Sequence, residues 1–228
     1  MAFGLPHIDR TEITMPMTEI DHLVITAPTL AAGAVYIERR LGTALSPGGQ
    51  HPRMGTHNLL LRLGERLYLE VIAINPNAPP PGLPRWFALD RLVATSTPSL
   101  VAWVARTTDI NHHASNASEP LGVVTGMQRG ERRWRITIPA DGEPVLAGAA
   151  PSLIEWEGTE HPAEILPDNG LTLASLKLLH PEPHRLALLF DSIELSEPLK
   201  IRLIGDRQPG LVATINLPSG RQATLRSA

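Results

Sequence analysis

Two apolar segments in the first third of the chain each carry one ionisable side chain, and a similar pair of segments follows about eighty residues later. The first pair places His22 in Ile-Asp-His-Leu-Val and Glu70 in Tyr-Leu-Glu-Val-Ile, and the second pair carries Trp103 and Glu155. An ionisable group buried in a strand without a partner costs several kcal/mol. We therefore expect His22, Glu70 and Glu155 to meet in one cleft between two related modules.

The order of predicted elements within the first module is strand, helix, loop and a hairpin of two strands. Thr29 and Gly42 are the expected caps of the helix, and Gly64-Glu65 is the expected hairpin turn. The predicted elements are a strand over 18–26, a helix over 30–41, a loop over 46–52, and strands over 57–63 and 66–74.

The same order recurs in the second module, and the tail repeats part of it. Predicted domain boundaries are an N-terminal extension over 1–17, a first βαβββ module over 18–75, a proline-rich linker over 76–98, a second module over 99–160, and a third, partial module over 170–228. In the tail, Pro181 is expected to begin a helix that runs to about Phe190. The fold class is thus α+β, with mixed sheets and all modules forming one larger domain.

Composition narrows the classes of function. The net charge of −3 gives no indication of a nucleic-acid or membrane partner, and no apolar run approaches the roughly 20 residues of a membrane span. The absence of cysteine excludes disulfides, thiolate metal sites and a cysteine nucleophile. The first residues lack the apolar segment of a signal peptide, so a cytoplasmic location is expected.

With these motifs in place, the chain resembles the vicinal oxygen chelate superfamily, specifically its glyoxalase-like branch. The residues that carry the resemblance are 20–24, 48–52 with 55–58, 68–73, 84–90 and 153–156. The resemblance implies paired βαβββ modules that close a U-shaped cleft, often around a divalent metal. It also implies ligands on the first and last strands of each module, which selects His22, Glu70 and Glu155. The fourth ligand position holds Trp103, a departure from a four-ligand glyoxalase site.

A histidine and two carboxylates would suit Fe(II), Mn(II), Zn(II) or Ni(II), with coordination positions left open for substrate and water. Such a metal acts as a Lewis acid on two neighbouring substrate oxygens, with Glu70 and Glu155 as the catalytic carboxylates. The alternative is that His22 and Glu70 bond directly to each other in a cleft without metal.

Several further residues have two interpretations each. His57 and Asn58 line the cleft mouth or anchor a loop, and Tyr68 shares the face of Glu70. Trp103 forms the cleft floor or belongs to the core, whereas Trp134 and Trp156 are expected in the core. Arg135 binds an anionic ligand or lies on an exposed sheet face. The remaining histidines are expected in a loop (His51) or on the surface (His112, His113, His161, His180 and His184).

The function predicted from these residues is a metal-assisted isomerase, lyase or ring-opening dioxygenase reaction on a small oxygenated organic molecule. A metal-free protein that sequesters a small aromatic ligand is the first alternative, and a dimerisation module with a vestigial cleft is the second. The expected partner is a small molecule, and a homodimer is a possible assembly.

Overall fold

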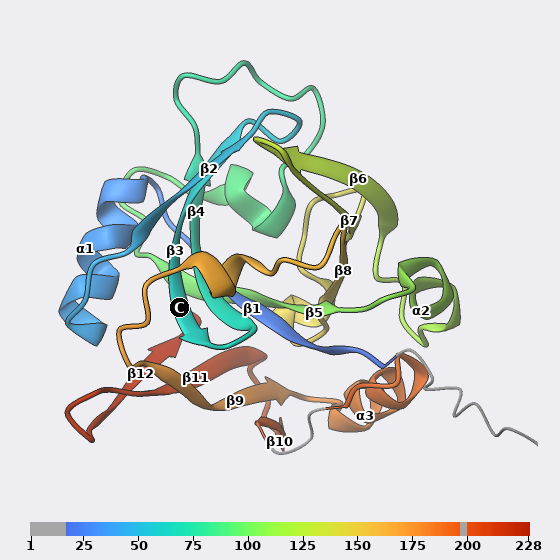
Figure 1. The fold of residues 1–228 in the computed structure, drawn as a ribbon. Coiled ribbons are helices and arrows are strands. Elements are labelled where there is room, and N and C mark those ends of the chain that lie inside the picture. Colours follow the sequence, from blue (N-terminus) through green and yellow to red (C-terminus); the bar gives the residue numbers. More distant parts are fainter. Residues whose placement is uncertain (1–16, 197–199) are drawn as a thin grey trace, which may run out of the picture.

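The computed structural model describes residues 17–196 and 200–228, and the predicted N-terminal extension lies, apart from Met17, outside this part of the chain. Within it, eight strands form one sheet in the order β2-β3-β4-β1-β5-β8-β7-β6, and four strands form a second sheet (Figure 1). The large sheet curls until its edge strands β2 and β6 contact each other. The predicted α+β class is confirmed.

The first module contains β1 (Glu19–Thr26), α1 (Leu30–Leu41), β2 (Ser46–His51), β3 (Thr56–Gly64) and β4 (Leu67–Ile74). Thr29 and Gly42 cap α1 as predicted, with the Thr29 hydroxyl accepting from the Ala32 amide and Gly42 in the left-handed region at φ 70°. The predicted loop over 46–52 is wrong, because most of it is β2. As an edge strand, β2 tolerates proline, and its pairing with β3 shifts register between Pro47 and Gly49.

The second module contains β5 (Ser99–Arg106), α2 (Ile110–Asn116), β6 (Val123–Arg129), β7 (Arg132–Ile138) and β8 (Ser152–Trp156). In each module the first strand pairs in parallel with the last, β1 with β4 and β5 with β8. The two modules join through the antiparallel pair of β1 and β5 at the centre of the sheet (Figure 1).

The third unit contains β9 (Thr172–His180), α3 (Pro183–Ser192), β10 (Ile201–Gly205), β11 (Gly210–Asn216) and β12 (Gln222–Arg226). Its strand order is β10-β9-β11-β12, so its first strand lies between the two strands that follow it, unlike β1 or β5. The helix α3 begins at Pro183 and not at Pro181, because Pro183 occupies the first turn, where a missing amide hydrogen costs nothing.

Both faces of the central strands β1, β4 and β5 of the large sheet are buried. One face packs against α1, α2 and the four-stranded sheet in a core that includes Leu23, Trp103 and Leu178. The other face forms a second core around Val24, Ile72 and Val104. Side chains alternate between the two cores in the middle of β1 and β5, and the second core is the wall of the cleft described below.

The predicted linker carries part of that wall. A 3-10 segment over Trp86–Arg91 buries Trp86 and Phe87 in the second core, although Phe87 adopts a positive φ of 58°. The linker is therefore more than a spacer between modules. Among the helices of residues 17–196 and 200–228, none has the length and apolar character required to span a membrane.

Candidate functional site

A hollow opens on the inner face of the curled sheet, and its empty space of about 290 Å³ includes open solvent. Its polar lining comes from His22 on β1, His51 on β2, Glu70 on β4 and Arg129 on β6. Its apolar lining is mainly aromatic and consists of Tyr68, Trp86, Phe87, Trp134 and Trp156, with Ile136 and Ile154.

The side chain of His22 is held from two directions. Its Nδ1 atom lies 2.6 Å from Oδ1 of Asp21, and its ring stacks on Tyr68 with 4.5 Å between centroids. A carboxylate can only accept a hydrogen bond, so Nδ1 carries the hydrogen and Nε2 is directed to Glu70, whose Oε2 lies 3.7 Å away. The predicted meeting of His22 and Glu70 is confirmed.

Asp21 reaches the same side of the sheet as its neighbour His22, although consecutive residues of a regular strand point to opposite faces. The pairing of β1 with β5 shifts register between Ile20 and His22, and this β-bulge redirects the Asp21 side chain. Its carboxylate is fully buried and accepts hydrogen bonds from Trp156 Nε1 at 2.9 Å and His161 Nε2 at 3.0 Å. Asp21 thus joins the first module to the segment after β8.

The hydrogen bonds also determine the charge of Asp21. Burial is the largest influence and raises the pKa of this carboxyl, but hydrogen bonds from His161 and His22 lower the pKa to well below its usual range. Nδ1 of His161 accepts from the Ala163 amide at 3.2 Å, so the hydrogen on Nε2 is available for Asp21. A buried anion therefore lies directly behind His22.

Glu70 is oriented by Asn58. The Asn58 amide donates to Glu70 Oε1 at 2.5 Å, and its Oδ1 accepts from the Gly49 amide at 2.8 Å. A side chain at Gly48 would collide with this arrangement, since a Cβ atom there would lie 2.0 Å from Asn58 Oδ1. Asn58 is thus a positioning residue, and the second Glu70 oxygen remains directed at His22.

His51 and Arg129 lie at the β2–β6 side of the hollow. Burial, followed by the positive charge of Arg129, lowers the pKa of His51 to about 3, so His51 is neutral near pH 7. Arg129 lies against Gly49, where an added Cβ would lie 2.7 Å from Arg129 Cγ. Within the described part of the chain, no carboxylate lies at ion-pair distance from Arg129. Its charge is available to a ligand.

The structure does not bring Glu155 to His22 and Glu70. The Glu155 carboxylate accepts from the Arg135 guanidinium at 2.6 Å and from the Ile110 amide at 2.8 Å, at the start of α2. Its strand neighbours Ile154 and Trp156 line the hollow instead. The prediction that the three ligands converge is wrong, because the side of β8 that faces the hollow is the opposite of the side that carries Glu155. Arg135 likewise lies outside the hollow, paired with Glu155.

Trp103 is also absent from the hollow. It is fully buried in the other core, where its Nε1 donates to the Ala149 carbonyl at 3.0 Å and its ring meets the edge of Phe190. Trp134 belongs to the second core, as expected, and Trp156 packs against that core, and both also line the hollow. His57 alternates with Asn58 on β3 and therefore faces away from Glu70, half-buried, with burial lowering its pKa.

Several histidines expected at the surface or in a loop are buried, namely His51, His113, His161 and His180. Among these, His51 and His161 complete the site, together with Asp21 and Trp156. Asp21 stands beside His22 in an apolar strand, and this position in the sequence could have indicated its role in the site. His161 had no such signal, because the chain after β8 must first cross the sheet before His161 meets Asp21.

A family model described as a glyoxalase-like domain matches residues 20–193. The chain belongs to this family. The glyoxalase-like protein is therefore a member of the vicinal oxygen chelate superfamily, as its motifs indicated. No protein of curated function matches its sequence.

Three solved structures are similar to this chain, and the first of them shares its fold. A hypothetical protein from Staphylococcus aureus aligns with a TM-score of 0.55 and 13% identity, over 91% of this chain and 85% of that chain. Methylmalonyl-CoA epimerase from Mycobacterium tuberculosis aligns with a TM-score of 0.40 and 16% identity, over 62% of this chain and 88% of that chain. A methylmalonyl-CoA epimerase in complex with methylmalonyl-CoA and NH4+ aligns with a TM-score of 0.41 and 15% identity, over 64% of this chain and 99% of that chain.

Members of the superfamily often use a divalent metal, so we compared the donors of the hollow with such a site. Three protein ligands are usual for a catalytic zinc, whereas the hollow supplies His22 Nε2 and Glu70 Oε2 and leaves Glu155 elsewhere. Within the part of the chain that the structure describes, the donors of the hollow do not complete a three-ligand catalytic site. In residues 17–196 and 200–228, the group of three donors within 4.8 Å of one another is at His112, His113 and Glu194.

Proposed function

We propose that the cleft binds a small organic anion with a carbonyl group and catalyses proton transfer next to that carbonyl, as an isomerase or lyase. The observation that carries this proposal is the facing pair of His22 Nε2 and Glu70 Oε2, each oriented by its own hydrogen-bond partner. Proton transfer needs a positioned acid and base, and this pair supplies both.

The steps follow from the orientation of the two groups. Glu70 takes a proton from the carbon beside the carbonyl, and the electrons of the broken C–H bond form an enolate. Protonated His22, stabilised by the Asp21 carboxylate behind it, donates its Nε2 hydrogen to the carbonyl oxygen. Return of a proton to the opposite face of the same carbon, while His22 takes back the proton from the oxygen, re-forms the carbonyl and completes an isomerisation. Loss of a leaving group from the next carbon along, with the same return of the oxygen's proton to His22, re-forms the carbonyl and completes an elimination.

The rest of the lining supports a small anionic substrate. Arg129 offers a charge without an ion-pair partner among the described residues, and a guanidinium suits a carboxylate. Aromatic walls favour a compact, flat molecule over a nucleotide or polymer. Burial raises the pKa of the Tyr68 phenol, so this hydroxyl stays neutral.

A metal-assisted version of this chemistry rests on the same 3.7 Å pair, which could supply two ligands to Fe(II), Mn(II), Zn(II) or Ni(II). The aromatic walls favour a second function, metal-free sequestration of a small aromatic ligand. In that case the cleft would bind its ligand without exchanging its protons.

The test measures deuterium exchange in D2O by proton NMR, with 2-oxo acids, 2-hydroxy acids, diketones and catechols as probes. The parent protein should exchange a proton of at least one probe, with or without chelator. Glu70→Gln and His22→Gln should each slow exchange about 100-fold or more. Arg129→Met should mainly raise KM for carboxylates. Glu38→Gln changes an exposed carboxylate on α1 and serves as the matched control.

The outcomes separate the alternatives. Exchange that disappears with chelator and returns with Mn2+ or Zn2+ supports the metal-assisted version. Tight binding without exchange supports sequestration. Exchange that is equal in Glu70→Gln and the parent contradicts the assigned base.

A further inference from the structure

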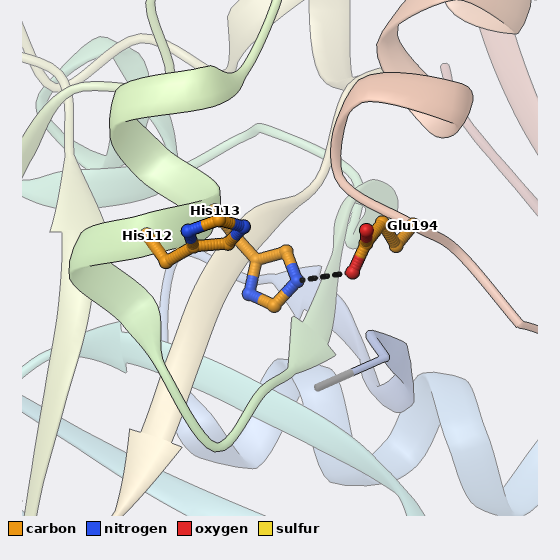
Figure 2. Close-up of side chains that lie close together, drawn as sticks. All are labelled: His112, His113 and Glu194. Atoms are coloured by element: carbon orange, nitrogen blue, oxygen red, sulfur yellow. Dashed lines mark ion pairs between the residues drawn. The ribbon is translucent and has the colours of Figure 1, made fainter. Parts of the chain in front are cut away.

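A group of three potential metal ligands lies apart from the cleft, between the second module and the third unit. His112 and His113 belong to α2, and Glu194 follows α3, with all three ligand atoms within 4.8 Å of one another. Figure 2 shows the His113 ring between the His112 ring and the Glu194 carboxylate. Two segments that are 81 positions apart in the sequence thus bring imidazole and carboxylate donors to one point.

The orientation of His113 is determined by its other ring nitrogen. The side chain is fully buried, and Nδ1 lies 2.9 Å from the Asp109 carbonyl oxygen and 2.8 Å from Thr107 Oγ1. A carbonyl can only accept, so Nδ1 carries the hydrogen and Nε2 is the ring nitrogen directed at Glu194. Nδ1–H donated to a backbone carbonyl is the arrangement that usually supports a metal-binding histidine.

Glu194 is held in position by its backbone. It adopts φ of 51°, which is unfavourable for a side chain with a Cβ atom. Its amide donates to the Asp191 carbonyl at 3.2 Å, and its carbonyl accepts from the Thr18 amide at 3.1 Å. Its Oε2 atom is buried, and within the described residues no donor is hydrogen-bonded to it. This oxygen lies 3.5 Å from His113 Nε2.

We propose that His112, His113 and Glu194 bind a divalent cation of the Zn2+ type, which fastens α2 to the end of α3. Two ligands at zinc distances of about 2.0–2.1 Å are roughly 3.3 Å apart in a tetrahedron, close to the 3.5 Å observed between His113 and Glu194. Two imidazoles and one carboxylate suit zinc, and water completes the coordination. His112 is exposed and can turn its ring from Asn116, whose Nδ2 lies 3.3 Å away.

The experiment uses the full chain, purified without a metal-affinity step and dialysed against chelator, with Zn2+ as the probe. Bound zinc is measured by elemental analysis and stability by thermal unfolding. The parent should bind zinc at this site and, at a hundredfold excess over Kd, gain about 5–10 °C in Tm. Glu194→Gln and His112→Ala should each weaken binding at least tenfold.

Matched controls separate this site from other effects. Glu38→Gln and His184→Ala change exposed residues of the same types on α1 and α3, and should keep the full zinc response. Glu70→Gln should also keep it, because the cleft plays no part. His113→Ala removes a buried side chain, so Glu194→Gln and His112→Ala decide the result if it fails to fold.

Two results would overturn the proposal. One is a parent protein whose Tm and zinc content do not respond to Zn2+, which would leave His113 and Glu194 as an ion pair. The other is a zinc response that Glu70→Gln abolishes and Glu194→Gln retains, which would place the metal in the cleft. Neither result depends on finding a substrate, so this proposal and the proposed proton transfer fail independently.

Discussion

At the scale of single residues, the site depends on one β-bulge and two buried histidines. The bulge at Asp21 places a carboxylate behind His22, and His161 and Trp156 donate to that carboxylate from the far end of the second module. His51 lies among the rings of Trp86 and Trp134 in edge-on contact. Asp21 and His51 are buried and have lowered pKa values, so their protonation states are coupled to folding.

His51 should make the protein sensitive to moderate acid. Its pKa is lowered from 6.5 to about 3 in the folded protein, mainly by burial. Between these values the unfolded chain binds the extra proton, so this stabilisation is complete above about pH 6.5 and is lost as the pH falls towards 3. We expect the free energy of unfolding to fall by up to about 1.4 kcal/mol per pH unit from this residue.

Urea unfolding between pH 7 and pH 4 measures this slope, and His51→Gln should flatten it. His184→Gln, at an exposed position on α3, should leave the slope unchanged. Equal slopes for His51→Gln and the parent would mean that His51 does not titrate as inferred.

At the scale of elements, α1 lies close to the sheet because one of its inward positions is glycine. A Cβ atom at Gly33 would lie 2.3 Å from Val71 Cγ1 on β4 and 3.1 Å from the Ala27 Cβ. The buried face of α1 consists of Gly33, Ile37 and Leu41. The absence of a side chain at Gly33 sets the distance between helix and strand at this point.

Gly33→Ala should therefore destabilise the protein, although alanine is the better helix former. The gain in helix propensity is about 1 kcal/mol, whereas forcing a methyl group into a packed core costs typically 1–3 kcal/mol. We expect a net loss of about 1 kcal/mol in urea unfolding. Adding Val71→Ala should relieve the clash, so that the double variant is more stable than the sum of the single effects. Additive effects would contradict this account.

At the scale of the whole molecule, the third unit and the large sheet share one core. Leu178 on β9 belongs to the same apolar cluster as Leu23 on β1 and Trp103 on β5. Hydrogen bonds also join the parts, with the Thr18 hydroxyl donating to the Ile193 carbonyl at 2.9 Å and both Arg185 nitrogens Nε and Nη2 donating to Glu119 at 2.8 Å. We expect the described units to unfold together.

Leu178→Ala tests this cooperativity. The side chain is fully buried, so the substitution should cost about 2–5 kcal/mol. All four tryptophans lie within residues 86–156, outside the third unit, so their fluorescence reports on the rest of the chain. The tryptophan transition and the far-ultraviolet circular dichroism transition should shift to lower urea together. A tryptophan transition that stays in place would show that the third unit unfolds separately.

The sequence by itself determined most of the elements and one half of the site. Apolar periodicity, Thr29 and Gly42 located α1, and the isolated polar residues His22 and Glu70 in apolar strands located the first-module face of the cleft. Repetition of that order, with the motifs around it, indicated the family that the comparison established. These are local signals, because each depends on residues a few positions apart.

Only the tertiary structure decided which face of β8 lines the cleft. Leu153 and Ile154 are both buried, one in each core, so alternation in the sequence does not distinguish the two faces. Because β5 is also buried on both faces, the sequence did not show which face carries Trp103. The glycines of β2 made this strand resemble a loop in the sequence. Asp21 needed a bulge set by pairing with β5, and His161 needed the chain after β8 to cross the sheet. Both depend on contacts between distant segments, which local sequence patterns do not encode.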